Sequence, residues 1–219
     1  MGAILSLLGW SFDKRKMDEI ASRYDKIVLV YPHTSSWDGF IAILLKYAYL
    51  NKYQMKLMLW SGIYDKFPKL FAKLGFVRVD NNKKSGTINT IGEQLKKFDK
   101  FLFVISPEGS RELREEFRSG FYYIAKTAGA SLMVANLNYS SHEVELFEPW
   151  LPGDSPEEEI KKIKHLFSLT PPLYPENTIY ARSFIGTPTR SCKYENLILL
   201  LSVIVYFIFV LIILFHKKL

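Results

Sequence analysis

The chain has 219 residues, which is enough for one domain with a sizeable hydrophobic core and an attached segment. Its formal net charge of +7 favours an acidic partner surface, but no nucleic-acid-binding motif is present, so anionic lipid fits better than nucleic acid. The single cysteine excludes an internal disulfide and a metal site built from several cysteines. The GxxxxGK[ST], GxGxxG and GxSxG motifs are absent, so the sequence does not support the nucleotide-binding and hydrolase classes that carry them.

The N-terminal residues 1–12 are apolar but too few to span a bilayer, and three basic residues follow at 14–16. No small-residue cleavage site follows, so a cleaved signal peptide is not expected. Trp10 beside the basic residues is typical of a segment in the lipid headgroup region. We therefore expect residues 1–16 to form an interfacial segment, with a helix packed on the domain as the alternative. Gly2 also fits the N-myristoylation pattern, which matters only in a eukaryotic host.

Short apolar runs alternate with amphipathic stretches through most of the chain. The apolar runs predict buried strands, and the amphipathic stretches predict helices. We expect strands at 26–31, 55–60, 76–79, 101–105, 132–137 and 144–147. We expect helices at 37–52, 63–74, 86–98, 117–128 and 156–167, and we expect the helix at 63–74 to be broken or capped near Pro68. The alternation predicts an α/β domain over residues 17–190, with a largely parallel sheet flanked by helices, and an edge strand is compatible with 180–190.

A long uncharged stretch lies near the C-terminus, at residues 197–215, and is rich in Ile, Val and Phe. As a helix it would measure about 28 Å, which is close to the ~30 Å hydrocarbon core of a bilayer. We therefore expect one C-terminal transmembrane helix that anchors the domain. Cys192 lies just before it and is either an inert thiol or a site of S-acylation.

Two polar stretches, 31–39 and 106–112, each follow an expected strand. The first holds His33 and Asp38. A neutral imidazole is suited to accept a proton from a hydroxyl near neutral pH, and it works better when a carboxylate fixes its tautomer. The second holds Arg111, whose planar fork suits phosphate. Each stretch alone also fits a surface turn, but sites in such sheets gather at the carboxyl ends of strands, so we expect the two stretches to form one site.

Together the two stretches resemble a known family. HTSSWD, from His33 to Asp38, resembles the H-x-x-x-x-D motif of glycerolipid acyltransferases, the enzymes similar to 1-acylglycerol-3-phosphate acyltransferase. SPEGSRE, at residues 106–112, resembles the F-P-E-G-T-R-S motif of the same family. The resemblance covers about half the chain, from residue 26 to residue 139. One departure is Asn81, which stands where the family usually carries an arginine.

The resemblance implies an O-acyltransferase that moves a fatty acyl group from acyl-CoA or acyl carrier protein to the free hydroxyl of a lysophospholipid. The default acceptor is 1-acylglycerol-3-phosphate, which gives phosphatidic acid. The resemblance implies His33 as the catalytic base, Asp38 as the residue that orients it, and no metal or organic cofactor. The implied substrate-binding residues are Glu108, Gly109, Ser110, Arg111, Arg78 and Lys83.

The implied partners are membrane lipids, the lysophospholipid acceptor and the acyl thioester donor, with no nucleic acid. Because such thioesters are intracellular, we expect the domain on the cytosolic side of a membrane, held by the C-terminal anchor. Two other functions fit the same sequence. One is a non-catalytic membrane lipid-binding protein of the same fold, for which Asn81 is the only hint. The other is an acyl-thioester hydrolase in which His33 activates water.

Overall fold

A computed structural model describes residues 2–79, 86–109, 113 and 116–185. Among the helices of these residues, none is both long and apolar enough to cross a membrane. The predicted transmembrane helix at 197–215 lies outside the described residues.

Within the described residues, seven strands form one sheet in the order β1-β7-β6-β2-β5-β3-β4. They are β1 (Ser11–Phe12), β2 (Lys26–Val30), β3 (Met55–Trp60), β4 (Phe76–Val79), β5 (Phe101–Ile105), β6 (Ser131–Asn138) and β7 (Glu143–Leu146). The five strands from β6 to β4 pair in parallel, β7 is antiparallel to β6, and β1 is parallel to β7. The predicted α/β domain with a largely parallel sheet is confirmed.

Eight α-helices are described. They are α1 (Gly2–Leu7), α2 (Lys14–Arg23), α3 (Ser36–Leu45), α4 (Ser61–Tyr64), α5 (Pro68–Lys73), α6 (Gly86–Lys96), α7 (Gly120–Ala128) and α8 (Pro156–Phe167). The break expected near Pro68 in the stretch 63–74 is confirmed, since α4 ends at Tyr64 and Pro68 begins α5. The residue before a proline avoids the helical region, which explains the break.

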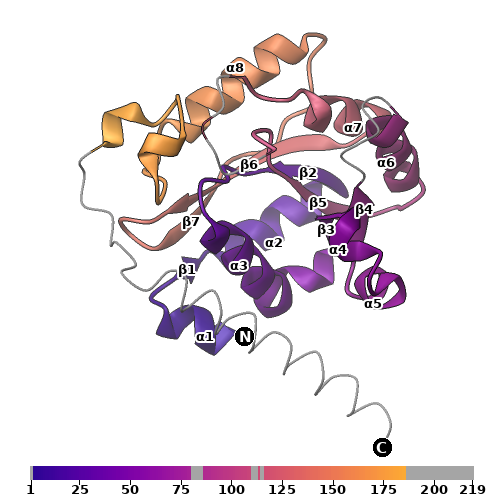
Figure 1. The fold of residues 1–219 in the computed structure, drawn as a ribbon, viewed down its shortest axis with the longest axis horizontal. Coiled ribbons are helices and arrows are strands. Elements are labelled where there is room, and N and C mark those ends of the chain that lie inside the picture. The colour runs from indigo at the N-terminus through magenta and orange to yellow at the C-terminus, as the bar shows by residue number, and fades with distance from the viewer. Residues whose placement is uncertain (1, 80–85, 110–112, 114–115, 186–219) are drawn as a thin grey trace, which may run out of the picture.

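Helices cover both faces of the sheet, so the core has two layers (Figure 1). Successive side chains of β2 point to opposite faces of the sheet, as in any β-strand, and so they pack alternately in the two layers of the core. Ile27 and Leu29 pack in the cluster that includes residues of α1, α2 and α3. Val28 and Val30 pack in the cluster that includes residues of α6, α7 and α8. β2 is therefore buried on both faces and holds its C-terminal end in a fixed place.

The N-terminal segment packs on the domain. Leu5 and Trp10 are buried, while Leu7 is 86% exposed. Ser11–Phe12 adds β1 to the sheet beside β7. The expected segment boundary at residue 16 falls inside α2, a helix that the sequence does not predict. This packing matches the alternative of a helix on the domain, and contact with a membrane interface stays a prediction.

After α8 the chain returns toward the carboxyl ends of the parallel strands. It forms two 3-10 turns, at Pro175–Asn177 and Arg182–Phe184. The edge strand considered at 180–190 is not formed as far as residue 185, and residues 186–190 lie outside the described range.

Candidate active site

The two motif stretches leave neighbouring strands at the same level of the sheet. β2 and β5 are parallel, and their last residues, Val30 and Ile105, are register partners. The backbone N–H of His33 donates to Oε2 of Glu108 at 2.6 Å, so the two loops are joined directly. The expectation that the two stretches lie side by side at the carboxyl edge of the sheet is confirmed.

His33 and Asp38 face each other across the first turn of α3. Nδ1 of His33 lies 3.3 Å from Oδ2 of Asp38, and the His33 side chain is 24% exposed. A carboxylate only accepts hydrogen bonds, so this contact places the ring proton on Nδ1. Nε2 of His33 then carries the lone pair that can accept a proton from a substrate hydroxyl.

Asp38 is held from several sides. Its Oδ2 accepts the backbone N–H groups of Thr34 at 2.7 Å and Ser35 at 2.8 Å. Its Oδ1 accepts the hydroxyl of Tyr139 at 2.5 Å. Asp38 is also the third residue of α3 and forms a reciprocal capping box with Ser35. The same carboxylate therefore starts the helix and orients the imidazole.

Glu108 is the second buried carboxylate of the site. Besides the N–H of His33, it accepts the hydroxyl of Tyr180 at 2.7 Å on Oε1 and that of Ser106 at 3.3 Å on Oε2. Burial raises the pKa of Glu108, and the hydrogen bonds from Tyr180 and His33 oppose that rise. Burial is also the main reason that the pKa of Tyr31, whose ring lies 5.7 Å from that of His33, is raised.

Gly109 has a φ of 65°, a region that favours glycine because other residues are strained there. A Cβ at this position would lie 3.2 Å from Cδ and Nε of Arg118, so glycine also gives space to that basic side chain. The other expected substrate-binding residues near here, Ser110 and Arg111, lie outside the described residues, as does Lys83.

Arg78 is on the edge strand β4, three strands away from β2 in the sheet order. Its guanidinium forms two hydrogen bonds of 2.7 Å with Asp65, one from Nε and one from Nη2. The structure therefore does not bring Arg78 into contact with His33 or Glu108. Nε and Nη2 of its guanidinium already donate to the carboxylate of Asp65.

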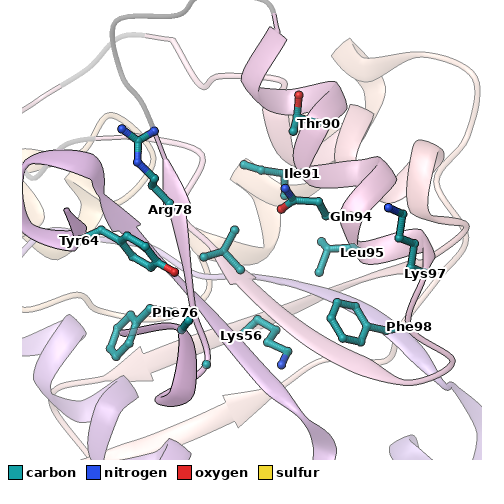
Figure 2. Close-up of a pocket in the computed structure, with 13 residues that line it drawn as sticks. Lys56, Tyr64, Phe76, Arg78, Thr90, Ile91, Gln94, Leu95, Lys97 and Phe98 are labelled. Atoms are coloured by element: carbon teal, nitrogen blue, oxygen red, sulfur yellow. The ribbon is translucent and has the colours of Figure 1, made fainter. Parts of the chain in front are cut away.

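Arg78 instead lines a groove of about 830 Å³ beside β4 and α6. Figure 2 shows Thr90, Ile91 and Gln94 on one side and Arg78 and Tyr64 on the other. His33, Asp38 and Glu108 do not line it. A second, apolar cavity of about 40 Å³ reaches Asp38 from the α3 side, and it has room for only a few water-sized groups.

No metal site was expected. Within the described ranges, no group of three or more His, Cys, Asp or Glu side chains is placed to hold a metal ion.

Tyr139 and Tyr180 belong to the site, but the sequence does not predict them as site residues. Tyr139 follows β6, and Tyr180 follows the proline-rich connector after α8. Neither stands at an informative spacing from His33 or Glu108. The only available signal for Tyr139 was its place directly after an expected strand.

No protein-family model matches the chain, and no curated protein matches it. Among solved structures it is similar to the crystal structure of the 1-acyl-sn-glycerophosphate (LPA) acyltransferase, PlsC, from Thermotoga maritima. The TM-score is 0.49 and the sequence identity 17%, over 66% of this chain. The chain spans 64% of the length of that structure. At this level of similarity the case for a function rests on the residues of the site.

Proposed function

We propose that this protein is an O-acyltransferase. It moves a fatty acyl group from acyl-CoA or acyl carrier protein to the free hydroxyl of a lysophospholipid, with 1-acylglycerol-3-phosphate as the leading acceptor and phosphatidic acid as the product. The observation that carries the proposal is the His33–Asp38 pair, with Nδ1 of a partly exposed imidazole 3.3 Å from a carboxylate that is 2% exposed.

In the proposed reaction, Nε2 of His33 takes the proton of the acceptor hydroxyl as that oxygen attacks the thioester carbonyl. The C–S bond then breaks, and the departing thiolate takes the proton from the imidazolium. Asp38 orients the ring and stabilises the imidazolium. A positioned base of this kind contributes roughly 10²–10⁴-fold to the rate. No acyl-enzyme forms, and no cofactor takes part.

Substrate binding by Glu108, Gly109, Ser110, Arg111, Arg78 and Lys83 is part of the proposal. The hydrogen bonds of Glu108 also support a role in positioning, because both of its carboxylate oxygens accept protein donors. Attachment to a membrane through residues 197–215, with the domain on the cytosolic side, completes the proposal.

The test is turnover of radiolabelled acyl-CoA and acyl carrier protein by the detergent-solubilised full chain, with and without 1-acylglycerol-3-phosphate. Label should enter phosphatidic acid only when acceptor is present. His33→Ala should lose at least about 100-fold in rate. His165→Ala is the matched control, because that histidine is exposed on α8, and it should keep full activity.

Two outcomes would overturn the proposal. Release of free fatty acid at the same rate without acceptor would indicate a thioester hydrolase. Absence of turnover over a panel of lysophospholipids and both donors, with lipid binding intact, would indicate a non-catalytic lipid-binding protein.

A further inference from the structure

The segment that follows α8 reaches the candidate site through Tyr180. The hydroxyl of Tyr180 donates to Oε1 of Glu108 at 2.7 Å. The other oxygen of the same carboxylate, Oε2, accepts the backbone N–H of His33 at 2.6 Å. The carboxylate of Glu108 thus links the hydroxyl of Tyr180 to the backbone of His33, the proposed base.

We propose that Tyr180 is a positioning residue for His33, acting through the carboxylate of Glu108. This inference rests on the proposed function, in which His33 is the catalytic base. It does not require Tyr180 to touch a substrate.

The ring of Tyr180 is itself held in place, so its hydroxyl has a fixed direction. Its centroid lies 5.7 Å from that of Phe117, edge to face, and 5.3 Å from that of Phe167. Both phenylalanines are buried, and Phe167 is the last residue of α8. Packing of this kind favours one orientation of the phenol.

The same segment makes a second contact with the loop that carries His33. The side-chain amide of Asn177 donates to the backbone oxygen of Thr34 at 3.4 Å. Tyr180 and Asn177 therefore contact the site from one short stretch, one through Glu108 and the other through the residue next to His33.

The charge of Glu108 decides how strongly it can hold His33. A carboxylate accepts a stronger hydrogen bond than a neutral carboxyl group. The titratable groups that interact with Glu108 are Tyr180, His33, Asp38 and Tyr31. Burial and the negative charge of Asp38 raise the pKa of Glu108, while Tyr180 and His33 lower it. Loss of the Tyr180 hydroxyl should therefore raise the pKa of Glu108 further.

Tyr180→Phe removes the hydroxyl and keeps the ring against Phe117 and Phe167. Tyr122→Phe is the matched control, because its hydroxyl donates to the backbone oxygen of Gly153 at 3.0 Å, and Gly153 is not one of the residues proposed for the site. Both variants lose one tyrosine hydrogen bond, so a general loss of stability should affect them alike. Circular dichroism checks that each variant is folded.

The first readout needs no activity. It is the pH titration of the His33 backbone amide, observed by NMR in full-length protein labelled with ¹⁵N-histidine and assigned with His33→Gln. This amide donates to Glu108, so its proton shift responds to the ionisation of that carboxyl group, and the ring ¹⁵N signals of the same label report the His33 ring separately. The midpoint should move to higher pH in Tyr180→Phe and stay unchanged in Tyr122→Phe.

The second readout is acyl transfer. Tyr180→Phe should lower kcat about tenfold, as expected for the loss of a hydrogen bond to a charged group, with little change in the KM of donor or acceptor. The acid limb of its pH–rate profile should move to higher pH. In a Glu108→Gln background, which has no carboxyl group to titrate, Tyr180→Phe should have little further effect on kcat.

An amide titration in Tyr180→Phe that matches those of wild type and Tyr122→Phe would overturn the inference. An equal loss of kcat from Tyr180→Phe with and without Glu108 would also overturn it. A shifted titration in a protein that transfers no acyl group would support the link from Tyr180 to His33 and reject the proposed function instead.

Discussion

Tyr139 and Asp38 are 101 residues apart in the chain, yet the hydroxyl of Tyr139 donates to Oδ1 of Asp38 at 2.5 Å. The other oxygen of Asp38 contacts His33. Tyr139 follows β6, which pairs directly with β2, so the sheet brings the tyrosine to the loop that carries the histidine. The position of His33, the proposed base, thus depends on β6 through Tyr139, although His33 itself follows β2.

Tyr139→Phe should lower both activity and stability. The change removes a hydrogen bond to a buried charged group, which typically contributes about 1.5–3 kcal/mol. The ring should stay in place, because Trp10 packs against it edge to face at 5.1 Å. Urea unfolding measures the loss of stability, and acyl transfer measures the expected fall in kcat.

Tyr123→Phe is the control for that measurement, because its side chain is 47% exposed. Equal stability and activity of Tyr139→Phe and Tyr123→Phe would show that the hydroxyl of Tyr139 does not hold Asp38.

Asp38 has two roles that different substitutions should separate. Asp38→Asn keeps an oxygen for the N–H groups of Thr34 and Ser35 but removes the charge, so it should fold and lose roughly 10²–10⁴-fold in kcat. Asp38→Ala should also lose about 2 kcal/mol or more, because it leaves buried N–H groups without an acceptor. Urea unfolding and acyl transfer measure the two effects.

Asp13→Ala tests capping alone. Asp13 caps α2 by accepting the N–H of Lys16 at 2.9 Å, and it is exposed. Its loss should lower stability by about 1 kcal/mol without lowering kcat. Full activity in Asp38→Asn would leave Asp38 with a capping role only.

The central strands could be predicted closely from the sequence. The strand expected at 101–105 is Phe101–Ile105, and that expected at 26–31 is Lys26–Val30. Both are buried on both faces, and such parallel strands appear in a sequence as continuous apolar runs. α2 (Lys14–Arg23) was missed because only Met17 and Ile20 of it are buried and its first three residues are basic.

The candidate site could be predicted only where its residues are close in sequence. His33 and Asp38 lie within one loop and helix start, so local spacing indicates their contact. Tyr139 and Tyr180 reach the two carboxylates over separations of 101 and 72 residues. Such contacts are set by strand order and by the path of the chain after α8, which leave no local pattern.

Lys46 should make stability depend on pH. Its side chain is 2% exposed and donates to the backbone oxygen of Met55, and burial lowers its pKa from 10.5 to about 8. Between these pH values the unfolded chain binds the proton and the folded chain does not, so the free energy of unfolding should rise with pH. The rise should be at most about 3 kcal/mol.

Lys46→Met should remove this rise, as measured by urea unfolding at several values of pH. Lys66→Met is the control, because Lys66 is exposed, and it should keep the wild-type dependence. An unchanged rise in Lys46→Met would mean that another group causes it.

The ion pair between Arg78 and Asp65 gives a test of Arg78 as a substrate-binding residue. The two side chains are 44% and 52% exposed, so the pair should contribute at most about 1 kcal/mol to stability. If Arg78 binds the acceptor phosphate, Arg78→Ala should raise the KM for acceptor. Asp65→Ala should lower that KM, because the guanidinium fork loses its competing carboxylate.

The KM for the donor is the internal control, and it should change in neither variant. Arg78→Lys separates charge from shape, because lysine keeps the charge but cannot bind a phosphate with two parallel hydrogen bonds. It should therefore raise the KM for acceptor less than Arg78→Ala does.

Equal KM values in wild type, Arg78→Ala and Asp65→Ala would assign Arg78 to the ion pair alone. The acceptor phosphate would then be left to the other proposed cations, Arg111 and Lys83, and Arg118, which lies against Gly109, would be a further residue to replace.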